Sequence, residues 1–175
     1  MNWWADLGVD GFRMDVINLI SKPAVYKDVP TAPGMQYGDV EPVVANGHRM
    51  HEFLQEMHQA VMAKHDLVTV GETPGATTDD AKKYANLEQT ELNMVFEFEH
   101  VGLNDNPALV KWSDKKVSLP ELRDNLVKWQ TQLNGKAWNS LYWNNHDQPR
   151  VVSRFGNDDP KYRVVSAKML ATMLH

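Results

Sequence analysis

The sequence predicts an α/β fold in which parallel strands alternate with helices. Short runs of β-branched and aromatic residues alternate with longer segments whose apolar residues recur at helical spacing. Strands that are separated by helices pair in parallel. Parallel sheets of this kind carry their functional loops at the carboxyl ends of the strands. We therefore expect the chemistry of this protein directly after each strand.

Four strands are predicted from runs rich in Val, Phe, Tyr, Trp and Leu that are short enough to be buried. They span Val9–Met14, Leu67–Gly71, Leu92–Phe98 and Ala137–Trp143. The two strongest helix predictions fall at Arg49–Lys64 and Leu119–Leu133, since the apolar residues of each segment form one face.

Capping residues mark the starts of two helices. Ser118 and Glu121 form a capping box before the helix at Leu119–Leu133. A weaker helix is predicted over Asp79–Ala85, and Thr78 is its expected cap.

Both ends of the chain have helical patterns. Asn2–Leu7 is typical of the last turn of a helix. A second pattern is an apolar stripe that stops at His175 without a cap and consists of Tyr162, Val165, Met169 and Met173. Since a domain rarely begins and ends inside helices, we expect residues 1–175 to be the central part of a longer domain.

One connection, residues 21–47, is unusually long. It contains four prolines and three glycines and shows no periodicity. Loops longer than about 15 residues inside compact domains are usually functional or disordered. We predict a lid or a substrate-binding wall on the active-site side, with disorder as the alternative.

Composition argues against several classes of protein. Cysteine is absent, which excludes disulfides and thiolate chemistry and fits a cytoplasmic protein. The net charge is −5 and no cluster of Lys and Arg stands out, so a nucleic-acid partner is not expected. No apolar run approaches the roughly 20 residues of a membrane span, and the N-terminus lacks the pattern of a signal peptide.

No metal site is predicted. His48, His51, His58 and His65 lie on one predicted helix, but their spacing lacks the second His of a zinc-protease helix. We interpret these histidines as part of a solvated helix surface.

Polar residues follow three of the strands. Arg13 and Asp15 are two residues apart on the first strand and therefore share a face, and a guanidinium beside a carboxylate favours its charged form. Glu72 ends the second strand with no cation among its sequence neighbours, and such surroundings disfavour ionisation, as a general acid requires. The last strand leads into Asn144–Arg150. Each feature alone also fits a structural ion pair, an isolated Glu or a turn, but together they predict a catalytic site.

Three of these segments resemble signature regions of the α-amylase superfamily. They are Gly11–Asn18 (GFRMDVIN), Val70–Gly75 (VGETPG) and Asn144–Arg150 (NNHDQPR), and the likeness extends to Glu91–His100 and Trp138–Asp158. The sequence is most similar to the α-glucosidase branch, in particular to its oligo-1,6-glucosidase members. The resemblance implies a (β/α)₈ barrel, of which this chain would supply the fourth to seventh strands.

The resemblance also implies roles for single residues. Asp15 matches the nucleophile and Glu72 the general acid/base, while Asp147 matches the carboxylate that grips hydroxyls of the sugar being cleaved. Arg13 and His146 match residues that orient the nucleophile and bind that sugar. Further substrate-contacting positions are Arg150 and Val16, and Val at the latter is common in members that cut α-1,6 bonds.

The implied function is retaining, exo-acting hydrolysis of α-1,6 bonds in isomalto-oligosaccharides, as part of carbohydrate metabolism and without a cofactor. A structural calcium site would need residues outside this segment. The alternatives are trehalose-6-phosphate hydrolase, glucan 1,6-α-glucosidase, a transglycosylating or isomerising enzyme, and a non-catalytic structural subunit, which generally lacks the carboxylates present here. We expect residues 1–175 alone to be inactive and to self-associate, because a partial barrel leaves strand edges unpaired.

Overall fold

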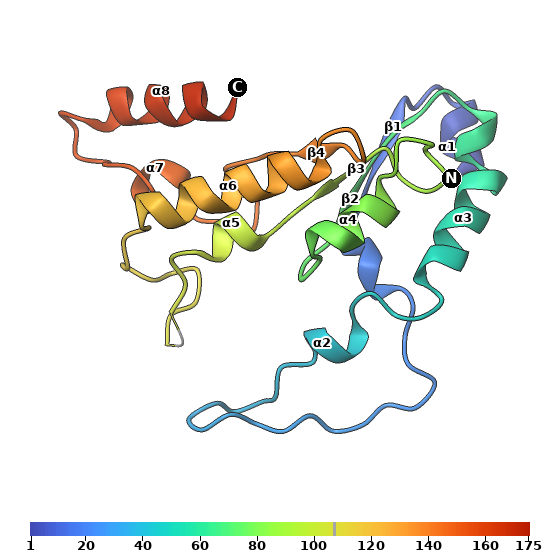
Figure 1. Ribbon diagram of the computed structural model, residues 1–175, viewed down its shortest axis with the longest axis horizontal. Helices are drawn as coiled ribbons and strands as arrows, with labels where there is room; N and C mark the ends of the chain where they lie inside the picture. The colour runs from blue at the N-terminus through green and yellow to red at the C-terminus, as the bar shows by residue number, and fades with distance from the viewer. Residues whose placement is uncertain (107) are drawn as a thin grey trace. The chain divides into compact units, whose positions relative to one another are not determined.

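The computed structural model describes residues 1–106 and 108–175, and these residues form two compact units (Figure 1). The first unit comprises Met1–Glu97 and Gln132–Ser140, and the second comprises Phe98–Thr131 and Leu141–His175.

The first unit contains one sheet of four parallel strands. In chain order and in spatial order these are β1 (Gly11–Met14), β2 (Val68–Glu72), β3 (Met94–Phe96) and β4 (Asn139–Ser140). The parallel α/β prediction is therefore confirmed. All four strands lie at the predicted places, but β4 is much shorter than predicted, and Leu141–Trp143 belong to the second unit.

In the sequence, short helices precede β1 and lie between the strands. They are α1 (Asn2–Asp6), η1 (Ile17–Leu19), α2 (Glu41–Val44), α3 (Met50–Ala60), η2 (Met62–Lys64) and α4 (Thr78–Tyr84). Met50 and Leu54 of α3 are fully buried, as the apolar face predicted. The predicted helix Arg49–Lys64 is interrupted at Val61, whose φ of −133° and ψ of −68° end α3 and start η2.

The cap of α4 is one residue earlier than predicted. Thr77, rather than Thr78, accepts a hydrogen bond from the Asp80 N–H, and the Asp80 carboxylate accepts one from the Thr77 N–H at 3.0 Å. Thr78 is already helical, and its hydroxyl donates to Gln132. The sequence offered two adjacent threonines, and only the one with an acidic residue at its third following position forms a capping box.

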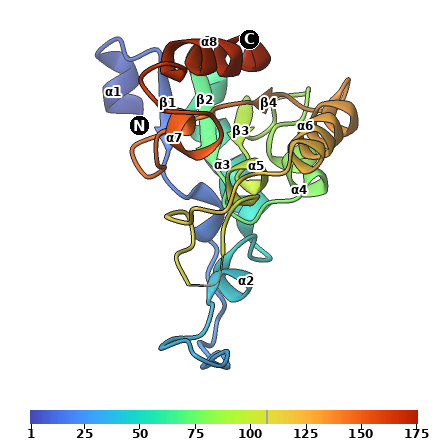
Figure 2. The same ribbon diagram turned by 90° about the vertical axis from the view of Figure 1, so that its left-hand side faces the viewer.

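The long connection extends away from the sheet and contains only α2 (Figures 1 and 2). Its base is closed by backbone contacts. The Asn46 N–H donates to the Asn18 carbonyl at 2.9 Å, and the Arg49 N–H donates to Ser21 Oγ at 3.1 Å. Gly47 permits this closure, because a Cβ at that position would lie 1.9 Å from the Ser21 carbonyl oxygen.

The second unit is helical. It contains α5 (Glu99–Gly102), most of α6 (Leu119–Leu133), α7 (Val151–Arg154) and α8 (Arg163–Leu174), and α6 has the predicted bounds. Its core is formed by Leu122, Trp143, Val151 and Leu170. The Trp143 indole N–H donates to the Leu170 carbonyl at 2.8 Å and so attaches α8 to this core.

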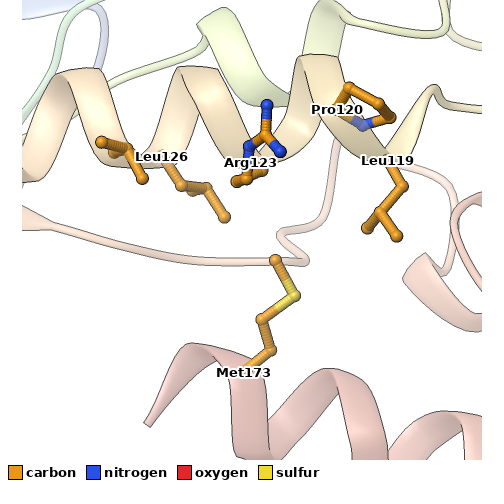
Figure 3. Close-up of a pocket in the computed structure, with 6 residues that line it drawn as sticks. Leu119, Pro120, Arg123, Leu126 and Met173 are labelled. Carbon is orange, nitrogen blue, oxygen red and sulfur yellow. The ribbon is translucent and has the colours of Figure 1, made fainter.

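The apolar stripe predicted on α8 is mostly exposed. Val165 is 70% exposed and Met169 51%, while Leu170 is the buried residue of this helix. Near Met173, an open groove of about 480 Å³ lies between α6 and α8 (Figure 3). Among the described residues, no helix is both long and apolar enough to cross a membrane.

Candidate active site

The first two strands bring Arg13, Asp15 and Glu72 together. In the parallel register Arg13 pairs with Val70 and Met14 with Gly71, so the carboxyl ends of β1 and β2 meet at one edge. One nitrogen of the Arg13 guanidinium, Nη1, donates to Asp15 Oδ1. The other, Nη2, lies 2.7 Å from Glu72 Oε2. A single guanidinium therefore bridges both carboxylates.

The two carboxylates differ in their exposure. The Asp15 side chain is 75% exposed, whereas that of Glu72 is 6% exposed. The hydrogen bond to Asp15 is the main cause that raises the pKa of Arg13 above its usual value, burial opposes it, and Glu72 adds to the rise. The prediction that the Arg13 guanidinium lies beside the Asp15 carboxylate is confirmed.

The cation-free surroundings predicted for Glu72 are wrong. Arg13 is 59 positions earlier in the sequence, but the parallel pairing of β1 with β2 places its guanidinium against the Glu72 carboxylate. Sequence neighbours alone do not show which charges lie across a sheet.

Val16 adds a main-chain contact to this cluster. Its φ of 34° and ψ of 46° place it in the left-handed region. Its N–H donates to Glu72 Oε2 at 3.2 Å, so the same carboxylate oxygen is bound by Arg13 and by Val16. This contact was not predicted, because the turn that follows β1 has no glycine to signal it.

His146, Asp147 and Arg150 form their own cluster on a loop of the second unit. His146 Nε2 lies 3.2 Å from Asp147 Oδ2, and both side chains are largely exposed. The Asn145 side chain accepts a hydrogen bond from the Asp147 N–H at 2.9 Å, which forms the tight turn that carries Asp147. Arg150 Nη2 donates to the carbonyls of Asn145 at 2.8 Å and Gln148 at 3.1 Å, so its guanidinium braces the loop.

Arg154 is a residue that sequence reasoning missed. It is 7% exposed and donates to Gln148 Oε1 at 2.7 Å, to Asn104 Oδ1 at 2.6 Å and to Asp105 Oδ1 at 2.7 Å. Burial lowers the pKa of its guanidinium, and Asp105 opposes that effect. These bonds tie the loop that carries Asp147 to the segment after α5. A lone Arg in a short helix gave no signal of this role.

The histidines predicted to be solvated are not all so. Only His51 and His58 lie in α3, and His51 Nδ1 is 2.9 Å from the buried carboxylate of Glu91. Gln55 donates to the same carboxylate at 3.1 Å. Among the described residues, no group of three or more His, Cys, Asp or Glu side chains is arranged to hold a metal ion.

Comparison with known proteins identifies the family. The family model of the α-amylase catalytic domain matches residues 1–175, which is the whole chain.

The chain belongs to the α-amylase family. The catalytic domain of this family is a (β/α)₈ barrel, and the four parallel strands of the first unit are part of it. The predicted family and fold are confirmed.

The relatives in this family include α-glucosidases. The chain is 58% identical over 176 residues to an α-glucosidase of Pediococcus pentosaceus and 55% identical over 175 residues to an oligo-1,6-glucosidase of Halalkalibacterium halodurans. Both alignments cover 100% of this chain and 31% of the relative. The chain therefore spans about a third of the length of these proteins.

Solved structures of family members share the fold. A trehalose-6-phosphate hydrolase of Bacillus licheniformis matches with a TM-score of 0.87 and 44% identity, over 99% of this chain and 30% of that one. An isomaltulose synthase of Klebsiella sp. LX3 matches with a TM-score of 0.86 and 33% identity, over 98% of this chain and 30% of that one.

Proposed function

We propose that residues 1–175 are part of an exo-acting α-glucosidase that hydrolyses α-1,6-glucosidic bonds of isomalto-oligosaccharides with retention of configuration. The observation that carries this proposal is the Arg13 guanidinium that holds Asp15 and Glu72 at one sheet edge. The oligo-1,6-glucosidases among the relatives, at 55% identity, support the choice of substrate. The absence of cysteine supports a cytoplasmic location.

In the proposed first step, Asp15 attacks the anomeric carbon and the glycosidic C–O bond breaks, while Glu72 gives its proton to the departing oxygen. The product is a glucosyl ester on Asp15. In the second step Glu72 takes a proton from water, whose oxygen bonds to the anomeric carbon and releases Asp15. The separation of about 5 Å between the two carboxyl groups that this mechanism requires stays a prediction.

The unequal exposure of the two carboxylates fits these roles. Asp15 is open to a substrate, and it accepts a hydrogen bond from the Arg13 guanidinium. Glu72 is enclosed, which restricts water around the proton that it transfers. By the family resemblance, we assign His146 and Asp147, which supply a donor and an acceptor, to hydroxyls of a bound sugar. Arg150 and the side chain of Val16 are assigned to further substrate contacts.

The decisive experiment uses the full-length protein that contains residues 1–175. It should release glucose from isomaltose, and proton NMR of the first product should show the α-anomer, as retention requires. Asp15→Asn and Glu72→Gln should each lower kcat severely. Initial release of the β-anomer would contradict the mechanism, and inactivity on isomaltose would contradict the substrate. Residues 1–175 alone should release no glucose.

Hydrolysis of trehalose 6-phosphate is the second candidate, favoured by the 0.87 TM-score to a hydrolase of that substrate. A site for a sugar phosphate would need a cluster of cations near the cleft. Arg13 is engaged by two carboxylates, and Arg150 by two loop carbonyls. We therefore place this substrate second. Parallel assays on isomaltose, dextran and trehalose 6-phosphate separate the candidates, and analysis of products from sucrose tests for isomerisation.

A further inference from the structure

The turn after β1 contains a backbone conformation that its sequence disfavours. Val16 has φ 34° and ψ 46°. For a β-branched residue a positive φ is a genuine outlier, because Cβ crowds the backbone in the left-handed region. Such a conformation persists only where the surrounding structure enforces it, and it is often found at functional sites.

Contacts on the C-terminal side of Val16 enforce this conformation. Ile17 is 8% exposed, and its Cγ2 occupies the space that a Cβ on Gly71 would fill, at 2.8 Å. Asn18 is fully buried, and its Nδ2 donates to the Pro74 carbonyl at 2.7 Å. The turn is therefore fixed against the end of β2 and the segment that follows Glu72.

The enforced conformation turns the Val16 N–H toward Glu72. The N–H donates to Oε2 at 3.2 Å, and Arg13 Nη2 approaches the same oxygen at 2.7 Å. Among the residues that the structure describes, both donors recorded for this carboxylate bind Oε2. Donors stabilise negative charge on the oxygen that they bind, so a proton on this carboxyl group belongs on Oε1.

We propose that Val16 is a positioning residue whose main-chain N–H anchors Oε2 of Glu72 and so assigns Oε1 as the oxygen that delivers the proton to the leaving group. This inference rests on the proposed function, in which Glu72 is the general acid. It concerns the main chain of Val16 and is independent of any contact between its side chain and a substrate.

The test replaces the Val16 amide by an ester in the full-length protein, through incorporation of the α-hydroxy analogue of valine. This change removes the N–H and keeps the side chain. Two substrates are compared: isomaltose, whose leaving oxygen needs a proton, and α-glucosyl fluoride, whose leaving group does not need Glu72 to the same degree. An ester at Val61 is the matched control, since its N–H donates to the Met57 carbonyl at the end of α3.

The proposal predicts that the Val16 ester lowers kcat on isomaltose by about 10- to 100-fold, the factor typical of a hydrogen bond to a charged group. KM should stay unchanged, and activity on the fluoride should be retained. The Val61 ester should leave both activities as they are. Equal losses on the two substrates, or no loss on either, would overturn the role of Val16 while the proposed function stands. A wild-type protein that is inactive on both substrates would overturn the proposed function and this inference with it.

Discussion

Arg13 shows how a single side chain organises the candidate site. Its planar guanidinium presents two nitrogens in a fixed fork, and each binds a different carboxylate. Asp15 directly follows β1, the strand that carries Arg13, whereas Glu72 is the last residue of the neighbouring strand, β2. The fork therefore ties the proposed nucleophile to the proposed acid across the β1–β2 pair.

Replacement of Arg13 by Lys should lower kcat/KM on isomaltose by about 100-fold in the full-length protein. One ammonium cannot hold both carboxylates in place, and a small displacement of reacting groups lowers the rate by about this factor. Steady-state kinetics measure the effect. Arg49→Lys is the matched control, because Arg49 also binds a carboxylate through two nitrogens but does so with Glu52 on the exposed surface of α3. Equal activity of the two variants would refute the bridging role.

Short elements are held in place by their ends. A short loop connects β2 to α4. The reciprocal hydrogen bonds of Thr77 and Asp80 fix the residue at which α4 starts. Four residues between Glu72 and Thr77 thus connect the candidate site to a defined helix end. A shifted start would move the loop that contains Pro74, the acceptor for Asn18.

We expect Thr77→Ala to destabilise α4 by about 1 kcal/mol, the usual cost of a lost cap. Amide hydrogen exchange in the first turns of α4 should become about fivefold faster, which corresponds to that free energy. Thr172→Ala serves as control, since the Thr172 hydroxyl donates to the Lys168 carbonyl within α8 and caps no helix start. Unchanged exchange in α4 would show that the capping box contributes nothing.

Glu99 at the start of α5 should give a measurable pH dependence. Burial raises the pKa of Glu99, but hydrogen bonds from Lys128 and Trp129 outweigh it and hold the pKa below its usual value of 4.5. The unfolded carboxyl group therefore takes up a proton before the folded one does. Its stabilisation is complete above about pH 4.5 and is lost as the pH falls through the lower, folded value.

Glu99→Gln should accordingly lower the thermal unfolding temperature at neutral pH, and the difference from wild type should shrink below about pH 4.5. Thermal unfolding followed over a series of pH values checks this. Asp124→Asn removes a carboxylate that pairs with Arg123 on the exposed surface of α6, and it controls for the loss of a negative charge. A difference that stays constant down to pH 3 would contradict the assignment.

The molecule as a whole leaves apolar and backbone surfaces open. β1 and β4 are the outer strands of the four-stranded sheet. On α8, Val165 and Met169 are more than half exposed, and the neighbouring groove includes Leu119, Leu126 and Met173 (Figure 3). Patches of this kind and open strand edges promote association.

Residues 1–175, expressed alone, should therefore self-associate, and sedimentation velocity should detect species larger than 20.0 kDa. A double variant with Val165→Lys and Met169→Lys should reduce that association, because charges oppose burial of the α8 face. Val25→Lys with Tyr26→Lys, at two exposed positions of the long connection, is the matched control. A monomer at all concentrations would refute the expectation.

The sequence alone determined the order and type of the main elements. Short runs rich in Val, Leu and aromatic residues located all four strands, and the helical spacing of apolar residues located α6. It also placed Arg13, Asp15, Glu72 and the Asn144–Arg150 loop at the carboxyl ends of the strands, and the three motifs indicated the α-amylase family. These features depend on residues that are close in the chain.

Only the tertiary structure decided which distant residues meet. The β1–β2 register brought Arg13 to Glu72 and corrected its expected surroundings, and packing of Ile17 and Asn18 against the end of β2 forced Val16 into the left-handed region. It also gave Arg154 its buried partners and left the α8 stripe exposed. Local sequence patterns determine the type of each element and its apolar face. The pairing of elements determines which charged and backbone groups meet when they are far apart in the sequence.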